Sequence, residues 1–373
     1  MSIPVLSFRG PHIEIGRQHG EALREGLASF AAYRISRCQH KVRASGADVS
    51  EREILDLAGR HLGPLAHFAP ELLEELEGMA ETSGVSLEAL VVLNSYTDFV
   101  DTLLRHVGPP AGIPPAAPVH PHGCTAFFAA PDATREQHVF LGQTWDMDGE
   151  AEQHVVALRL DIPGEPPCVL LTHAGGLGLA GLNQAGMGVA INNLVPLDAR
   201  VGVPFPFLVR RALACVDFDN AFLALTQVPF ASGHNYLLSD AEGRAVNVET
   251  TGEECEVVSI ESPVYAHANH YTCETLKPLA ATLAPGSTTC SREARLRELL
   301  EERKGSLDVQ ALHDCLADPK VEVASPGVST LPGEPPHWSC ATAIFDLTAR
   351  AAHLRKGHPS QGPLQKLDFE TNR

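Results

Sequence analysis

The sequence predicts an α+β fold in which antiparallel sheets are covered by helices. The first 107 residues carry apolar side chains at helical spacing. Beyond Cys124 the chain turns to short runs rich in Val, Phe and Leu that are separated by turn clusters. Pairs of helical segments interrupt these runs without a regular strand–helix alternation, which favours antiparallel sheets over a parallel one.

Four helices are expected before the strand-rich part, over residues 12–30, 50–62, 70–84 and 86–107. Gly16 and Gly20 lie on the apolar stripe of the first helix, and because glycine weakens a helix, they indicate close packing on a neighbouring element. Ser50 and Glu53 form a capping box at the second helix, and Pro70 opens the third. We expect these helices to form one layer and a wall of a substrate pocket.

The strand-rich part begins after Cys124. Strands are expected at residues 125–130, 138–143, 154–160, 168–173, 188–193, 236–239, 244–249, 256–260 and 340–347. Helices are expected at residues 207–216, 220–226, 291–303 and 309–316.

A proline-rich segment separates the two parts of the chain. Six prolines lie between residues 109 and 121, which predicts an extended, exposed stretch that joins neither helix nor sheet. We therefore expect residues 1–123 to form a helical N-terminal segment and residues 124–373 to form the core. The two together are expected to make one globular unit.

Composition limits the classes of function. The 46 acidic and 28 basic side chains give a formal net charge of −18, which argues against nucleic acid or an anionic membrane as partner and favours a neutral or cationic small substrate. The nine cysteines are irregularly spaced and lack a Cys-x-x-Cys motif, so we expect reduced thiols of a cytoplasmic protein, without a disulfide scaffold or a zinc site. Neither a signal peptide nor a membrane-spanning run is recognisable.

Cys124 is the centre of the candidate site. A single cysteine is usually a small buried hydrophobe, but here Gly123 precedes it, Thr125 follows it and the proline-rich segment ends beside it. Gly123 can adopt strained backbone angles that expose its carbonyl to the neighbouring thiol. Cleavage of the Gly123–Cys124 bond would leave an N-terminal cysteine, whose amine has an unperturbed pKa near 8 and whose thiol has one near 8.5. Such an amine can accept the thiol proton, so one residue holds both nucleophile and base.

Short motifs follow one another in a specific order, at residues 9–20, 77–80, 123–125, 143–146, 181–193, 234–240 and 267–270. Together they resemble the cysteine-type N-terminal-nucleophile (Ntn) hydrolases around acyl-coenzyme A:6-aminopenicillanic acid acyltransferase and the β-alanyl-dopamine hydrolases. The resemblance implies a four-layer αββα sandwich, no cofactor, and a small amide or acyl-thioester substrate. It also implies autocatalytic cleavage at Gly123–Cys124 into an αβ heterodimer, whose further oligomerisation the sequence leaves open.

The resemblance also implies roles for individual residues. Asp146, 22 residues after Cys124, matches the family's aspartate beside the new amine, and Asp148 is its rival because it lies on the same face of an ideal strand. Asn269 matches the asparagine that donates to the oxyanion. Further candidates for the pocket are Thr125, Asn192 and Asn193. His267 and His270 are three residues apart without a third ligand, so no metal is expected.

One departure from the family's pattern concerns an arginine. Related sequences often carry it in the segment before the last core strand, whereas residues 321–340 contain none. Ser291 and Arg292, at a helix start, are the candidates to supply this charge. The sequence therefore leaves two interpretations open: an enzyme that hydrolyses or transfers the acyl group of a linear amide through a Cys124 thioester, and an unprocessed, catalytically silent relative that binds a ligand.

Overall fold

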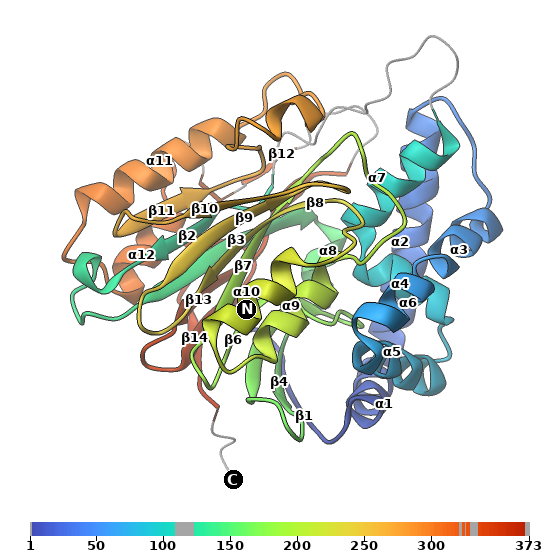
Figure 1. Cartoon of the computed structure of the whole chain (residues 1–373), viewed down its shortest axis with the longest axis horizontal. Coiled ribbons are helices and arrows are strands. Elements are labelled where there is room, and N and C mark those ends of the chain that lie inside the picture. The colour runs from blue at the N-terminus through green and yellow to red at the C-terminus, as the bar shows by residue number, and fades with distance from the viewer. Residues whose placement is uncertain (1, 109–122, 321–322, 325, 329–334, 370–373) are drawn as a thin grey trace.

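The computed structural model describes residues 2–108, 123–320, 323–324, 326–328 and 335–369 (Figure 1). The proline-rich stretch that is expected to be extended therefore lies outside the described residues. Two stacked β-sheets form the centre of the molecule, and helices cover their outer faces.

The first sheet has eight strands. In spatial order they are β1 (Val5–Arg9), β4 (Val155–Asp161), β5 (Cys168–His173), β6 (Ala180–Asn183), β7 (Gly188–Leu194), β8 (Gly233–Ser239), β9 (Ala245–Thr250) and β10 (Cys255–Ser259). All neighbours are antiparallel except β1 and β4, which are parallel.

The second sheet is antiparallel throughout. In spatial order its strands are β11 (Val264–His267), β2 (Ala126–Ala129), β3 (Phe140–Asp148), β13 (His337–Asp346), β14 (Ala351–Lys356) and β15 (Gln365–Leu367), with β12 (Pro326–Val328) beside β13. The short helix α8 (Glu150–His154) links β3 to β4, and 3₁₀ turns span Pro131–Ala133, Lys277–Leu279 and Pro359–Gln361.

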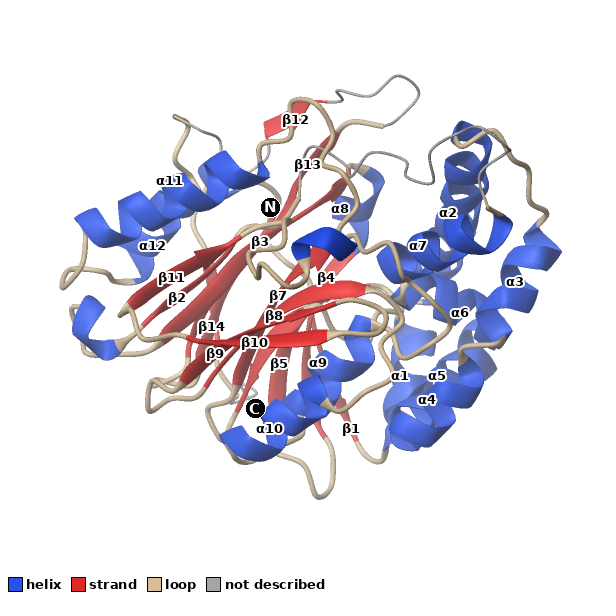
Figure 2. Cartoon of the chain, turned by 45° about the horizontal axis from the view of Figure 1, so that its top comes forward, coloured by secondary structure: helices blue, strands red, loops and turns tan. Residues whose placement is uncertain are grey.

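Helices complete four layers, as the family resemblance implies. Helices α9 (Phe205–Leu213) and α10 (Phe218–Thr226) pack on the first sheet, whereas α11 (Thr289–Glu302) and α12 (Val309–Leu316) pack on the second (Figure 2). Alternation along the strands explains the layering, because successive side chains point to opposite faces. Phe127 of β2 packs with Leu296 and Leu300 of α11, whereas the next residue, Phe128, joins the core between the sheets.

Seven further helices gather on one side of the sandwich (Figure 2). They are α1 (His12–Ala22), α2 (Arg24–Ala44), α3 (Glu51–Gly59), α4 (Leu62–Phe68), α5 (Pro70–Ser83), α6 (Leu87–Asn94) and α7 (Tyr96–Val107). A β-carbon on Gly16 would lie 1.9 Å from the carbonyl oxygen of Glu75. Helices α1 and α5 therefore touch through their backbones, which confirms the packing role predicted for that glycine.

The structure corrects three helix boundaries. The predicted helix over residues 12–30 breaks at Leu23, and its second half continues to Ala44. The predicted helix over residues 50–62 ends at Gly59 and is followed by α4. The predicted helix over residues 86–107 breaks at Ser95, whose hydroxyl donates to the Val91 carbonyl at 2.5 Å, a back-bond that bends helices. Within the described residues, no helix is long and apolar enough to cross a membrane.

Candidate active site

A cavity of about 170 Å³ opens where helices α2 and α7 meet β3 and β7, and Cys124 lies in its wall. Apolar side chains such as Tyr96, Val100 and Ile191 contribute to its lining, together with Asp146 and Asn269. The volume is close to that of the engineered cavity of roughly 150 Å³ that holds benzene. The cavity therefore offers room for a small acyl group next to the thiol.

Hydrogen bonds hold the main chain of Cys124 firmly. Its carbonyl oxygen accepts from Asn192 Nδ2 at 3.0 Å and from Arg292 Nη1 at 3.0 Å. The backbone N–H of Thr125 donates to Thr144 Oγ1 at 3.2 Å, and the Thr125 hydroxyl accepts from Arg292 Nη1 at 2.6 Å. Because a carbonyl oxygen has two lone pairs, both acceptor sites of Cys124 are occupied.

The Cys124 thiol is protonated at neutral pH in the continuous chain. Burial and, to a lesser extent, the negative charge of Asp146 raise the pKa of the Cys124 thiol to about 12, against the opposing effects of the Asp146 backbone N–H and of Arg292. The Cys124 nitrogen is an amide here, so it cannot act as a base. Only 5% of this residue is exposed, which shields the thiol from solvent.

The structure separates the two candidate aspartates by their partners. Asp146 Oδ1 accepts from Ser339 Oγ at 2.5 Å, and its charge acts on the Cys124 thiol. Asp148 Oδ2 accepts from Arg34 Nη1 of α2 at 3.0 Å, and both side chains are almost fully buried. Because an ion pair already neutralises Asp148, Asp146 is the better placed of the two to act on an amine at Cys124.

Gly123 and the side chain of Asn269 are in direct contact. A β-carbon on Gly123 would lie 2.4 Å from Asn269 Oδ1 and 2.9 Å from Nδ2. The amide of Asn269 donates from Nδ2 to the Asn193 carbonyl at 3.0 Å and accepts at Oδ1 from Arg292 Nη2 at 3.1 Å. The structure thus holds this amide beside the peptide group that precedes Cys124.

Arg292, a candidate to supply the arginine that residues 321–340 lack, lies beside Cys124. It lies in the first turn of α11 with 1% of its surface exposed, and it donates to Cys124, Thr125 and Asn269. The adjacent Ser291 is exposed, and its hydroxyl donates to the Thr288 carbonyl at 2.8 Å. The structure therefore brings Arg292 to the site and leaves Ser291 outside it.

The remaining candidates take different positions. Asn192 is buried and touches Cys124, whereas Asn193 is half-buried, lines the cavity and contacts Asn269 through its carbonyl. Ser339, which binds Asp146, was not singled out from the sequence, because no motif marks it. In the parts of the chain that the structure describes, no three His, Cys, Asp or Glu side chains form a set of metal ligands.

Comparison with known proteins identifies the family of this chain. The family described as acyl-coenzyme A:6-aminopenicillanic acid acyl-transferase matches residues 133–361. The 40 kDa form of acyl-coenzyme A:6-aminopenicillanic-acid-acyltransferase from Emericella nidulans is 23% identical over 360 residues, which cover 95% of this chain and 93% of that protein.

One solved structure supports the fold. A variant of the conjugated bile acid hydrolase from Clostridium perfringens matches with a TM-score of 0.50 at 15% identity, over 66% of this chain and 92% of its own. Penicillin V acylase from Agrobacterium tumefaciens matches with a TM-score of 0.46 at 15% identity, over 66% of this chain and 86% of its own. The chain has the Ntn-hydrolase fold and belongs to the acyl-coenzyme A:6-aminopenicillanic acid acyltransferase family of acyltransferases and amidases.

Proposed function

We propose that this chain is a self-cleaving, N-terminal-cysteine enzyme that hydrolyses or transfers the acyl group of a linear amide through a thioester on Cys124. One observation carries the proposal: the Gly123–Cys124 peptide group lines the cavity, next to Asp146 and Asn269 and within reach of Arg292. This is the set of groups that acyl transfer from a thiol nucleophile requires.

Self-cleavage is the first reaction. The Cys124 sulphur attacks the Gly123 carbonyl carbon, the C–S bond forms as the C–N bond breaks, and the thiol proton passes to the departing nitrogen. Water then hydrolyses the thioester, which releases residues 1–123 with a new carboxylate. Cys124 is left with a free amine and a free thiol, in an αβ heterodimer.

Turnover uses the same groups. The amine of Cys124 takes the thiol proton while the sulphur attacks the substrate carbonyl, and it passes that proton to the departing amine. Asn269 donates one amide hydrogen to the Asn193 carbonyl and offers its second to the developing oxyanion. Asp146 orients the ammonium form of the amine. Water completes a hydrolysis, and an amine completes a transfer.

The proposal identifies the substrate only by its chemical class. The relative from Emericella nidulans is named as an acyltransferase that uses acyl-coenzyme A, so acyl thioesters are candidate donors beside linear amides. The apolar lining of the cavity favours an apolar acyl group of modest size.

The experiment is a denaturing gel with intact mass on freshly purified protein. Wild type should give pieces of 123 and 250 residues, and Cys124→Ala should give one full-length chain. Alkylation of Cys124 should abolish release of amine from a panel of acyl amides in proportion to the label. A full-length wild-type chain that binds acyl amides without turning them over would instead identify the silent relative, and the presence of Arg292 in the site argues against that outcome.

A further inference from the structure

A second cavity adjoins the first cavity, whose wall contains Cys124. The volume of the second cavity is about 420 Å³, against about 170 Å³ for the first. The two cavities share Val195 and Asn269, so the amide that is proposed to bind the oxyanion lies at their border. The rest of the second wall comes from residues 270–290, which run from the end of β11 to the first turn of α11. A carbonyl group held at Asn269 would therefore have room on both sides.

Hydrogen bonds hold the wall of the second cavity in place. The backbone N–H of Ala281 donates to the Val195 carbonyl at 2.9 Å, just beyond the end of β7. The backbone N–H of Asn269 donates to Thr289 Oγ1 at 2.7 Å, at the start of α11. The stretch is thus tied to both the first sheet and the helix that covers the second sheet, and the cavity is present before any ligand binds.

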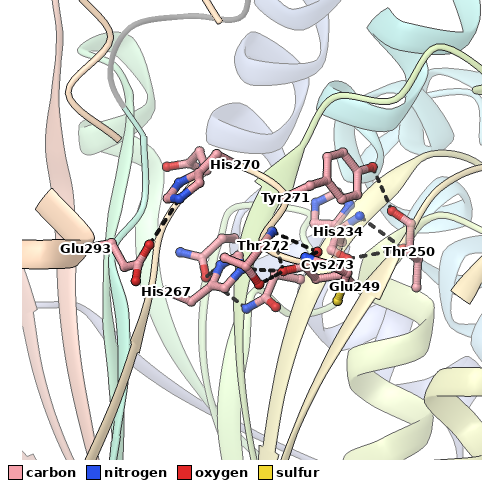
Figure 3. Close-up of polar contacts among 12 residues, drawn as sticks. His234, Glu249, Thr250, His267, His270, Tyr271, Thr272, Cys273 and Glu293 are labelled. Atoms are coloured by element: carbon pink, nitrogen blue, oxygen red, sulfur yellow. Dashed lines mark hydrogen bonds and ion pairs between the residues drawn. The ribbon is translucent and has the colours of Figure 1, made fainter. Parts of the chain in front are cut away.

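Polar side chains in the second wall already have protein partners. The Tyr271 hydroxyl donates to the Thr250 carbonyl at 2.8 Å, and His270 Nε2 lies 3.0 Å from Glu293 Oε2 (Figure 3). Lys277, at the rim, pairs with the acidic residue three positions before it. Valine, alanine and leucine side chains contribute most of the remaining lining. Because a polar ligand group would lose its water without gaining a partner here, the cavity suits an apolar group.

The two cavities differ in their exposure to solvent. Every described residue in the wall of the first cavity is buried or half-buried, whereas Lys277 and Cys290 in the wall of the second are exposed. An acyl group stays on the sulphur throughout the thioester stage, so it must occupy the cavity that Cys124 lines. The amine has to leave before water or another amine can react, so it needs the more exposed cavity.

We propose that the second cavity binds the amine side of the substrate, and that it takes an amine with an apolar substituent. This amine is the group that leaves in hydrolysis and the group that accepts the acyl chain in transfer. The inference rests on the proposed function of Cys124 and adds to it the chemical class of the amine and the place where it binds.

A bound amine would also favour transfer over hydrolysis. The nitrogen of the incoming amine attacks the thioester carbon, the C–N bond forms as the C–S bond breaks, and the proton that the amine loses returns to the sulphur. An amine held in the second cavity is already next to the thioester, which raises its effective concentration relative to that of free amine.

Narrowing each cavity separately tests the assignment. Cys290→Trp narrows the second cavity, and Val100→Trp narrows the first. The substrates are amides that differ only in the acyl group, acetyl or hexanoyl, or only in the amine, methylamine or hexylamine. Cys290→Trp should lower kcat/KM roughly 10-fold or more for hexylamides relative to methylamides, whatever the acyl group. Val100→Trp should discriminate by acyl group instead, and the opposite pattern would overturn the inference.

Two controls separate cavity volume from other effects. Ser291→Trp places the same ring on the next residue of α11, which is exposed and lines neither cavity, and it should keep every rate within roughly twofold of wild type. Cys290→Ser changes the side-chain volume little and should also behave as wild type. A loss in either control equal to that of Cys290→Trp would contradict the inference. If Cys290→Trp does not fold, Leu283→Trp narrows the same cavity from the loop before α11.

The ratio of transfer to hydrolysis provides a measurement that does not depend on the overall rate. With added hexylamine, Cys290→Trp should give a ratio roughly 10-fold below that of wild type, and with added methylamine the ratio should be the same in both proteins. A cleaved, active protein in which Cys290→Trp changes neither this ratio nor the preference for amides would overturn this inference alone. An uncleaved chain that acts on none of these amides would contradict the proposed function, and this inference with it.

Discussion

The guanidinium of Arg292 lies 3.0 Å from the main-chain carbonyl oxygen of Cys124, across 168 positions of sequence. The same side chain donates to Oδ1 of Asn269 at 3.1 Å. One buried cation therefore positions both the nucleophile and the amide that is proposed to stabilise the oxyanion. The planar guanidinium of Arg292 suits this task, since it presents several hydrogen-bond donors in a fixed geometry.

Replacing Arg292 by lysine should slow self-cleavage and turnover by roughly 10- to 100-fold, because a single ammonium cannot reach all three acceptors at once. The measurement is a time course of the two chains on a denaturing gel, followed by kcat of the cleaved fraction. The matched control is Arg297→Lys on the same helix, whose side chain is 57% exposed and pairs with Glu293. Equal effects of the two variants would argue against a special role for Arg292.

Removing the amide of Asn269 should lower kcat on the order of a hundred- to a thousandfold and leave KM nearly unchanged, because an oxyanion gains more from that donor than a ground-state carbonyl does. Asn269→Ala also leaves the Asn193 carbonyl and an Arg292 N–H without their partner, so the melting temperature should fall somewhat. Turnover and melting should be measured on one preparation. Lowered stability with normal turnover would show that Asn269 is only structural.

A methyl group at Gly123 should delay self-cleavage, since its carbon would lie 2.4 Å from Asn269 Oδ1 and must displace that amide. Displacements of about 1 Å can cost on the order of a hundredfold in rate, and we expect an effect of this size for Gly123→Ala. Once cleaved, residue 123 is no longer joined to the nucleophile. The processed fraction should therefore turn over substrate at the wild-type rate, and impaired turnover after complete cleavage would contradict this explanation.

The buried histidine His12 should make stability depend on pH. Burial lowers the pKa of His12, but its contacts with Glu165 at 2.9 Å and Glu75 at 3.2 Å outweigh this and raise the pKa to about 9. A raised histidine pKa stabilises the fold fully below the unfolded pKa of 6.5, and the effect is lost as pH rises towards 9.

His12→Gln should therefore destabilise the protein most near pH 6, by at most about 3 kcal/mol, and much less above pH 9. Urea unfolding at both pH values provides the measurement. The exposed His67, changed to Gln, should show a difference close to zero at either pH. If His12→Gln lowers the free energy of unfolding equally at both pH values, the charged form of His12 is not the origin of the stabilisation.

Local patterns accounted for much of the fold and for the centre of the site. The strand expected over residues 168–173 and the helix expected over residues 309–316 match β5 and α12 at both ends, because alternation and caps act over a few residues. Strands β6, β11, β14 and β15 were not predicted, since they have six residues or fewer and form mainly through pairing with distant neighbours.

Placing Arg292 in the site required tertiary structure. The Ser291–Arg292 pair made it a candidate, but its contact with Cys124 depends on how α11 docks on the second sheet, which no local pattern specifies. The contact between Glu249 and His267 could not be predicted from the sequence either, because the two residues come from different sheets and meet between them. Motifs thus identified the reactive atoms, and packing determined which distant side chains hold them.

The cavity draws on both sides of the Gly123–Cys124 bond. Arg34, Tyr96 and Val100 come from the helical segment, whereas Asp146 and Asn269 follow Cys124 in the chain. A cut at this bond would divide the protein into one piece that shapes the pocket and another that makes and breaks bonds. Changes in α2 or α7 could then alter which acyl groups enter while the reacting atoms stay as they are. If the two pieces are produced separately, exchanging the first piece between relatives would exchange the acyl groups that the enzyme accepts.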